Sequence, residues 1–174
     1  MGFGLLESVD MLRRTPSVLR EQVAHSAQGW TDARKGADEW SAHQMVCHLA
    51  YIEEQDWMVR IRMVMSEGAA RPFPPVEHGD VSGRYPGVPT DEVADRFAAI
   101  RARNLEELGR LVPDESGLDG VGLHPSLGTV TLRQLLATWV VHDLNHLAQL
   151  DAALASRYAD EVGPWKSLLG ILDD

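Results

Sequence analysis

The chain has 174 residues, 44% of them hydrophobic and 24% charged, a composition typical of a globular domain that buries its own core. Its net charge of −10 argues against binding to nucleic acid, and its single cysteine, Cys47, excludes an internal disulfide and a zinc site built from several thiolates. The first residues show no signal-peptide pattern, and no run of about eighteen apolar residues occurs, so we expect one cytoplasmic domain, residues 1–174, without a signal peptide and with no membrane partner.

Two pairs of arginines are the nearest approach to a basic patch: Arg60 with Arg62, and Arg101 with Arg103. In each pair a single apolar residue separates the two arginines, on a segment with helical periodicity. Such pairs are typical of the solvated edges of helices. We therefore expect all four side chains to face water.

The N-terminal segment predicts a helix in two parts. Apolar residues recur at helical spacing between Gly4 and Arg14, at Leu5, Leu6, Val9 and Leu12. Thr15 followed by Pro16 has the pattern of an N-cap and a first helical residue. We expect the helix to kink or restart there and to run to about Ser26.

A polar linker bracketed by Trp30 and Trp40 leads to the second helix, and we expect both tryptophans to plug one end of the fold. Ser41 is followed three residues later by Gln44, the pattern of a capping box that opens a helix. Helical periodicity then continues over residues 42–67. One stripe of this helix is apolar and inward-facing, and it includes a histidine: Met45, His48, Leu49, Ile52, Val59 and Met63.

Residues 68–89 interrupt the helical pattern with five prolines and four glycines. A loop this long inside a compact domain is usually a lid, a pocket wall or a crossover. We expect Thr90 to cap a third helix that continues to about Pro113. A second loop, residues 114–130, is rich in glycine and is predicted to be partly extended at 121–124.

The longest helix is predicted to begin at a second capping box, Thr131 with Gln134, and to run to about Ala155. It carries His142 and His146 four residues apart. A four-residue step turns about 400°, so both imidazoles leave the same face of the helix. Apolar residues continue that face: Leu135, Trp139, Leu150 and Ala153. The two histidines are therefore expected to point into the core.

Four amphipathic helices with little strand signal predict an all-α fold, an antiparallel four-helix bundle with a long crossover between its second and third helices. The tail turns at Gly163 and Pro164 and is predicted to form a short C-terminal helix. Its apolar residues Trp165 and Leu168 would pack on the bundle or on a second subunit, so a homodimer is a further expectation.

Inward side chains of a four-helix bundle meet near its axis, which is where bundle metal sites are built. If the second and fourth helices are neighbours, His48 joins His142 and His146. Three neutral imidazoles with open positions are typical of a catalytic zinc site, and imidazole also suits nickel, iron, cobalt and manganese. The alternative is three core histidines that hydrogen-bond to the backbone or to polar side chains nearby, namely Gln44, Gln55 and Asn145.

Other polar residues near the three histidines are less specific. Asp143 and Asn145 could each orient a ring, and Asp143 could equally be a surface residue. His78 and His124 lie on the two loops and could line a pocket mouth. The remaining candidates are expected to stay outside the site, with Cys47 as a small core residue and with water-facing side chains at His43, Glu53 and Glu54.

The sequence resembles the DinB/YfiT-like family of proposed metalloenzymes over nearly its whole length. The resemblance rests on Trp40-Ser41 with His48-Leu49, on the stretch from His124 to Leu150, and on the VGPW motif that ends at Trp165. It implies a four-helix bundle and a divalent metal held by three histidines, one early in the second helix and two on the last long helix. The positions that match are His48, His142 and His146.

The resemblance also implies a reaction class. Characterised relatives include thiol-dependent S-transferases and isomerases, and many form homodimers. We therefore expect a metal-dependent enzyme that activates water, as a hydrolase, or a low-molecular-weight thiol, as a transferase, for attack on a small substrate. Zinc or nickel is the expected metal, with iron, manganese or cobalt as alternatives. The rival interpretation is a non-catalytic bundle, with or without metal, that acts as a binding or stress-response module.

Overall fold

The computed structural model describes residues 2–173, so the two end positions of the predicted domain, 1 and 174, lie outside it. The described helices and strands are α1 (Leu5–Val23), α2 (Gln28–Thr31), α3 (Ala42–Gln55), α4 (Trp57–Glu67), α5 (Thr90–Leu111), β1 (Val121–His124), β2 (Gly128–Thr131) and α6 (Leu132–Ser156). Short 3-10 segments are η1 (Ser82–Arg84), η2 (Glu115–Gly117), η3 (Gly163–Leu168) and η4 (Gly170–Leu172). None of these helices is both long enough and apolar enough to cross a membrane.

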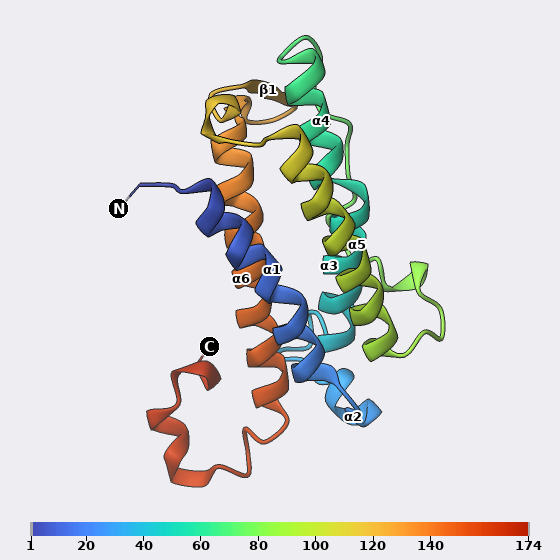
Figure 1. The fold of residues 1–174 in the computed structure, drawn as a ribbon. Helices are drawn as coiled ribbons and strands as arrows, with labels where there is room; N and C mark the ends of the chain where they lie inside the picture. The colour runs from blue at the N-terminus through green and yellow to red at the C-terminus, as the bar shows by residue number, and fades with distance from the viewer. Residues whose placement is uncertain (1, 174) are drawn as a thin grey trace.

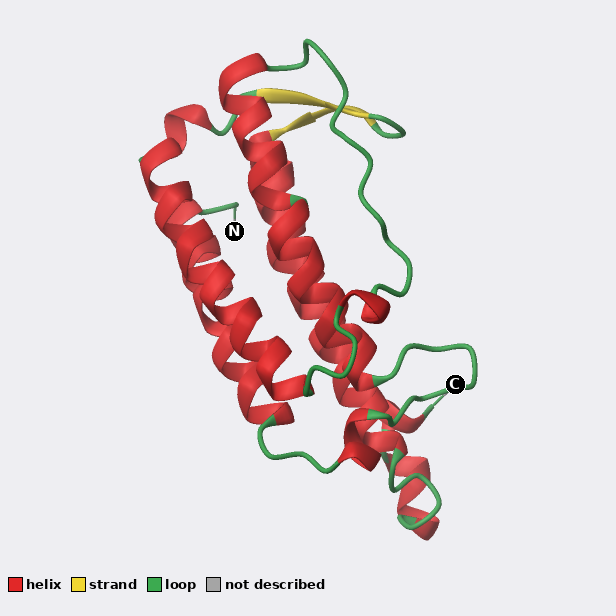
Figure 2. Ribbon diagram, turned by 90° about the vertical axis from the view of Figure 1, so that its right-hand side faces the viewer, coloured by secondary structure: helices red, strands yellow, loops and turns green. Residues whose placement is uncertain are grey.

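The predicted four-helix bundle is confirmed (Figure 1). Its first arm is α1, its second consists of α3 and α4 end to end, its third is α5, and its fourth is α6. α4 ends beside the β-hairpin, and residues 68–89 then run back along the bundle to the opposite end, where α5 begins (Figure 2). The crossover makes α5 run in the same direction as α3 and α4, so the pair α3 and α5 and the pair α1 and α6 are parallel rather than antiparallel as expected. Each arm therefore has one parallel and one antiparallel neighbour, and α3 lies beside α6.

Both predicted capping boxes are present. The Ser41 hydroxyl accepts from the Gln44 amide at 3.2 Å, and the Gln44 side chain accepts from the Ser41 amide at 2.8 Å. Thr131 and Gln134 repeat the arrangement at the start of α6. Each box satisfies two amide donors that a helix otherwise leaves free, so the two helices that carry the histidines begin at defined residues.

Three predicted helix boundaries were wrong. α1 is a single helix that does not restart at Pro16, because Thr15 is buried on the same face as the core leucines of α1 and packing holds the two parts together. The second arm breaks at Asp56 into α3 and α4, although the backbone hydrogen bonds on either side of Asp56 persist. Thr90 is the first residue of α5 rather than its cap, and its hydroxyl instead contacts His43.

A two-stranded hairpin closes one end of the bundle. Residues 121–124 are extended as expected, and they pair with a second strand that was not predicted. β1 and β2 pair antiparallel, with Val121 opposite Thr131 and His124 opposite Gly128. The crossover loop is attached to this hairpin, since the Phe73 amide donates to the Leu123 carbonyl at 2.8 Å. The hairpin and the loop together form a wall over the adjoining parts of α4 and α6.

The predicted short C-terminal helix consists of the 3-10 segments η3 and η4. Trp165 and Leu168 are 67% and 77% exposed there, so they do not seal the bundle. At the other predicted plug, Trp30 packs edge-on against Tyr158, whereas Trp40 lies against the buried histidines. The two tryptophans that bracket the linker therefore cover different parts of the molecule.

Candidate metal centre

The structure brings the three predicted histidines together. His48 comes from α3, and His142 and His146 come from consecutive turns of the neighbouring α6; one ring nitrogen of each lies within 4.8 Å of the others. The Nε2 atoms of His48 and His142 are 3.4 Å apart. Two nitrogens bound to a tetrahedral metal at about 2.0–2.1 Å would be separated by about 3.3–3.4 Å. The spacing of this pair is therefore that of a metal site.

Burial keeps the three imidazoles neutral. It lowers the pKa of His48 to about 4 and the pKa of His142 to about 3, and in both cases the charge of neighbouring histidines adds to the effect. Burial also lowers the pKa of His146, although Gln149 and Asp143 partly oppose this shift. Neutral imidazole is the form that binds metals, so the cluster is in its metal-binding form at neutral pH.

Each ring also keeps one nitrogen without a protein partner. The Nδ1 atoms of His48, His142 and His146 are buried and form no hydrogen bond with any described residue. A core histidine normally satisfies such an atom, because leaving it unpaired costs about 1–3 kcal/mol. Asn145, one of the partners that the core-histidine alternative required, is exposed on α6. The hydrogen-bonded core histidines of the alternative interpretation are therefore not found, whereas the converging Nε2 atoms of His48 and His142 fit a bound divalent metal.

Aromatic side chains cover the histidine cluster on two sides. The Trp40 ring lies 4.8 Å from the His48 ring and stacks on His146 at 6.2 Å between centroids. Trp57 meets His142 edge-on at 5.2 Å and stacks on Trp139. These rings restrict the access of water to the cluster and lower its local polarity.

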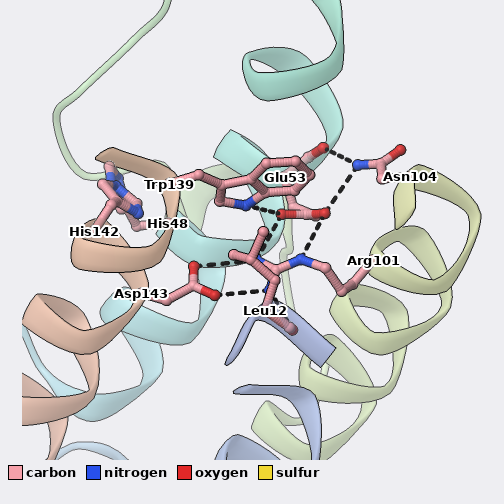
Figure 3. Close-up of polar contacts among 8 residues, drawn as sticks. All are labelled: Leu12, His48, Glu53, Arg101, Asn104, Trp139, His142 and Asp143. Carbon is pink, nitrogen blue, oxygen red and sulfur yellow. Dashed lines mark hydrogen bonds and ion pairs between the residues drawn. The ribbon is translucent and has the colours of Figure 1, made fainter. Parts of the chain in front are cut away.

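Asp143, between the two histidines of α6, belongs to a buried ionic network centred on Arg101 (Figure 3). Both arginine and aspartate are 1% exposed, so the expectation of a solvated Arg101 and the surface alternative for Asp143 were wrong. Glu53, expected to face water, is 2% exposed and pairs with the same guanidinium. A pattern of apolar residues could not reveal these positions, because their burial depends on mutual pairing across helices.

Every N–H of the Arg101 guanidinium has an acceptor. Nε and Nη2 donate to the two oxygens of Glu53 at 2.9 and 2.8 Å, and Nη1 and Nη2 donate to Asp143 at 2.7 and 3.1 Å. The last N–H donates to the Leu12 carbonyl at 2.7 Å. One side chain thus joins all four arms of the bundle and holds α3 against α6.

The carboxylate of Glu53 collects further donors. Asn104 Nδ2 reaches Glu53 Oε1 at 2.9 Å, and the Trp139 indole reaches Oε2 at 3.2 Å. Burial raises the pKa of Glu53, although Arg101 opposes that shift. Burial also disfavours the charge of Arg101, but Glu53 and Asp143 together raise its pKa. The network is closed, since its donors and acceptors serve one another.

A cavity of about 190 Å³ reaches His142 from the hairpin end of the bundle. Most of its wall is apolar: Ile52, Trp57, Phe73, Leu127, Val130 and Leu135. His78 and His124, the two loop histidines, both line it as anticipated for a pocket mouth. Asp56, which was missed, also lines it, and so does Arg60, for which the expectation of a water-facing side chain was wrong, since it is 8% exposed. The usable signal was spacing, because Asp56 lies four residues after inward-facing Ile52 and four before Arg60.

Two other predicted residues can be placed. His43 is half-buried rather than exposed, and its Nδ1 lies 2.9 Å from the Thr90 hydroxyl. Cys47 is fully buried, as expected of a small core residue. Burial, with a smaller contribution from Asp80, raises the pKa of its thiol to about 12, so it is a poor nucleophile or ligand.

A sequence profile of the DinB superfamily matches residues 11–150. The chain belongs to the DinB superfamily. Among solved structures, it is similar to YfiT from Bacillus subtilis, described as a probable metal-dependent hydrolase with an unusual four-helix bundle topology. The two superpose with a TM-score of 0.76 at 17% identity, over 93% of this chain and 91% of that one, which shows a shared fold. A search of curated proteins found no match.

Proposed function

We propose that this DinB-superfamily protein is a divalent-metal-dependent enzyme whose metal is held by His48, His142 and His146. The observation that carries the proposal is the convergence of three neutral imidazoles, His48 and His146 buried and His142 half-buried, beside a cavity that reaches His142. Zinc or nickel suits this ligand set best, and iron, manganese and cobalt are alternatives. When bound, the metal would supply Lewis acidity toward a small substrate or its nucleophile.

The protein's own residues have separate roles in this proposal. The three imidazoles bind the metal, and Arg101 positions α3 and α6 through Glu53 and Asp143. Trp40 and Trp57 exclude water from two sides of the site. On the cavity wall, His124 Nδ1 accepts from the amides of its own turn at 3.2 Å, so the neutral ring keeps its proton on Nε2. The Nε2–H of His124 can therefore donate a hydrogen bond to a bound substrate.

For the nucleophile, the proposal favours water, which makes the enzyme a hydrolase of a small substrate. The cavity of about 190 Å³ is below the roughly 300–1,000 Å³ typical of pockets for drug-sized ligands. The description of YfiT as a probable metal-dependent hydrolase supports this choice. A low-molecular-weight thiol is the alternative nucleophile, for an S-transferase, and a screen of esters and amides beside thiol cosubstrates with electrophiles separates the two.

Metal content is the direct test of the site. We expect the purified wild-type protein to hold a stoichiometric divalent metal, measured by mass spectrometry of the metals, and His142→Ala to lose it. His25→Asn is the matched control, because His25 is exposed and its φ of 53° is readily adopted by asparagine. Circular dichroism checks that each variant is folded. A wild-type protein without stoichiometric metal would contradict the proposal, and metal without turnover of any substrate would favour the binding module.

We also propose that the protein forms a homodimer through its exposed tail. Trp165 and Leu168 expose large apolar surfaces, which on soluble domains often mark contacts with other chains. Light scattering should give the mass of two chains, and serine at both positions should lower it to one.

A further inference from the structure

Arg60 has donors that no described residue uses. It lies on α4, is 8% exposed, and lines the cavity that reaches His142. Its Nε forms an ion pair with Asp56, one turn earlier, but that nitrogen makes no well-directed hydrogen bond, and no other described residue accepts from the guanidinium. A guanidinium has five N–H donors, and a buried charge with unused donors is costly unless a ligand or water takes them. Arg60 is therefore equipped to bind an acceptor in the cavity.

The surroundings of Arg60 favour a planar anion. The Asp56 carboxylate, 5% exposed, occupies the Nε side, and Arg60 Cζ lies 5.5 Å from the centroid of the Phe73 ring. These contacts hold the plane of the guanidinium and leave its terminal nitrogens for another partner. Two parallel N–H groups in a fixed plane match the two oxygens of a carboxylate.

Among the other polar groups of the wall, His124 adds a donor. His124 offers its Nε2–H, since its Nδ1 already accepts two backbone amides. Arg60 and His124 both line the cavity, so the two side chains face a common space. His78 also lines the cavity, and Asp56, already paired, is its one carboxylate among the described residues.

We propose that this cavity binds the carboxylate group of a small acid with an apolar body, through the guanidinium of Arg60. The apolar side chains between Arg60 and His142 would cover the body of the ligand, and its far end would lie beside the histidine cluster. The size of the cavity and its apolar lining suit such an acid better than a polyphosphate. The inference rests on the proposed function only where it places the reactive end of the ligand beside the histidine cluster. The contact between the carboxylate and Arg60 needs no metal.

Binding of hexanoate and hexanamide, measured by calorimetry on metal-free and zinc-loaded protein, tests the inference. The two probes have the same shape and differ in charge. We expect wild-type protein to bind hexanoate at least about tenfold more tightly than hexanamide in both forms, which is the effect of a charge-assisted hydrogen bond. Equal affinities in the metal-free protein would overturn the inference.

Two variants assign the preference to Arg60. Asp56→Asn with Arg60→Gln removes both charges together and should abolish the preference for hexanoate. Arg60→Lys keeps the positive charge but lacks the two parallel N–H groups of a guanidinium, so it should reduce the preference for hexanoate. This variant replaces the double variant as the test if the double variant fails to fold. Arg62→Gln is the matched control, because Arg62 lies on the same helix, is exposed, and pairs with Glu107. A preference that persists in both Arg60 variants would overturn the inference.

The two proposals fail separately in this design. If zinc is not bound stoichiometrically while metal-free protein still prefers hexanoate through Arg60, the metalloenzyme proposal fails and the carboxylate site stands. If zinc binds and hexanoate shows no preference that depends on Arg60, the carboxylate site fails and the metal site stands. Hexanoate binding that needs zinc and ignores Arg60 would place the carboxylate on the metal and overturn the inference.

Discussion

Arg101 and Arg60 are both buried, and both form ion pairs with carboxylates. The two differ in how many of their guanidinium donors the protein itself uses. Every donor of Arg101 is used by an acceptor on one of the three other arms of the bundle. Arg60 has one acidic partner, Asp56, at the break just before its own helix, and it faces a cavity with the rest of its guanidinium. A closed network stabilises the relative positions of helices, whereas an open one leaves binding capacity for a ligand.

The largest expected effect on stability follows from removing Arg101 from its hydrogen-bonded network with Glu53 and Asp143. Arg101→Met leaves Glu53 and Asp143 buried without their counter-charge, which should lower the free energy of unfolding by about 3–5 kcal/mol. Urea unfolding measures the loss. Arg103→Met, an exposed position on the same helix, should change stability by less than about 0.5 kcal/mol.

A triple variant sharpens the same comparison. Arg101→Met combined with Glu53→Gln and Asp143→Asn should recover part of the loss, because the penalty comes from unpaired buried charges. Equal stability of Arg101→Met and Arg103→Met would show that the network does not stabilise the bundle.

The histidine cluster should make the metal-free protein sensitive to acid. The pKa values of His48 and His142 are lowered from 6.5 to about 4 and about 3, so below pH 6.5 the unfolded chain binds more protons than the native state. Stability is therefore retained above pH 6.5 and lost as the pH falls. Between pH 7 and 5 the loss should be about 1–2 kcal/mol for each of the two histidines.

Unfolding at a series of pH values, after removal of metal by a chelator, measures this dependence. His142→Gln should flatten the profile, and His25→Asn should leave it unchanged. A profile that is flat from pH 7 to 5 in the wild-type protein would contradict neutral, buried histidines.

The smallest expected loss of stability comes from a substitution in the wall of the cavity that Arg60 lines. Gly122 on β1 faces the Phe73 ring so closely that an added Cβ would overlap it. Gly122→Ala should cost about 1–3 kcal/mol through overpacking, and should weaken hexanoate binding because Phe73 supports Arg60. Metal content should stay unchanged, since the histidine cluster lies on other elements. Gly109→Ala, with open space around it, is the control. A loss of metal would mean that the wall and the metal site are coupled.

Local patterns predicted much of the fold and of the candidate metal site. Capping boxes at Ser41 and Thr131 begin the two histidine-bearing helices, because a cap depends only on residues three positions apart. The four-residue step between His142 and His146 likewise places both on one face. The break at Asp56 was not predicted, since it lies within a pattern that reads as continuous helix.

Periodicity alone established the helical arms, the inward direction of His48, His142 and His146, and the long crossover, because each depends on neighbours in the chain. The arrangement of the arms in space established the rest. It placed α3 beside α6, paired Arg101 with carboxylates from two other helices, and left Arg60 facing a cavity. A buried charge is stable only with partners, and these partners are distant in sequence, so their positions exist only in the folded chain.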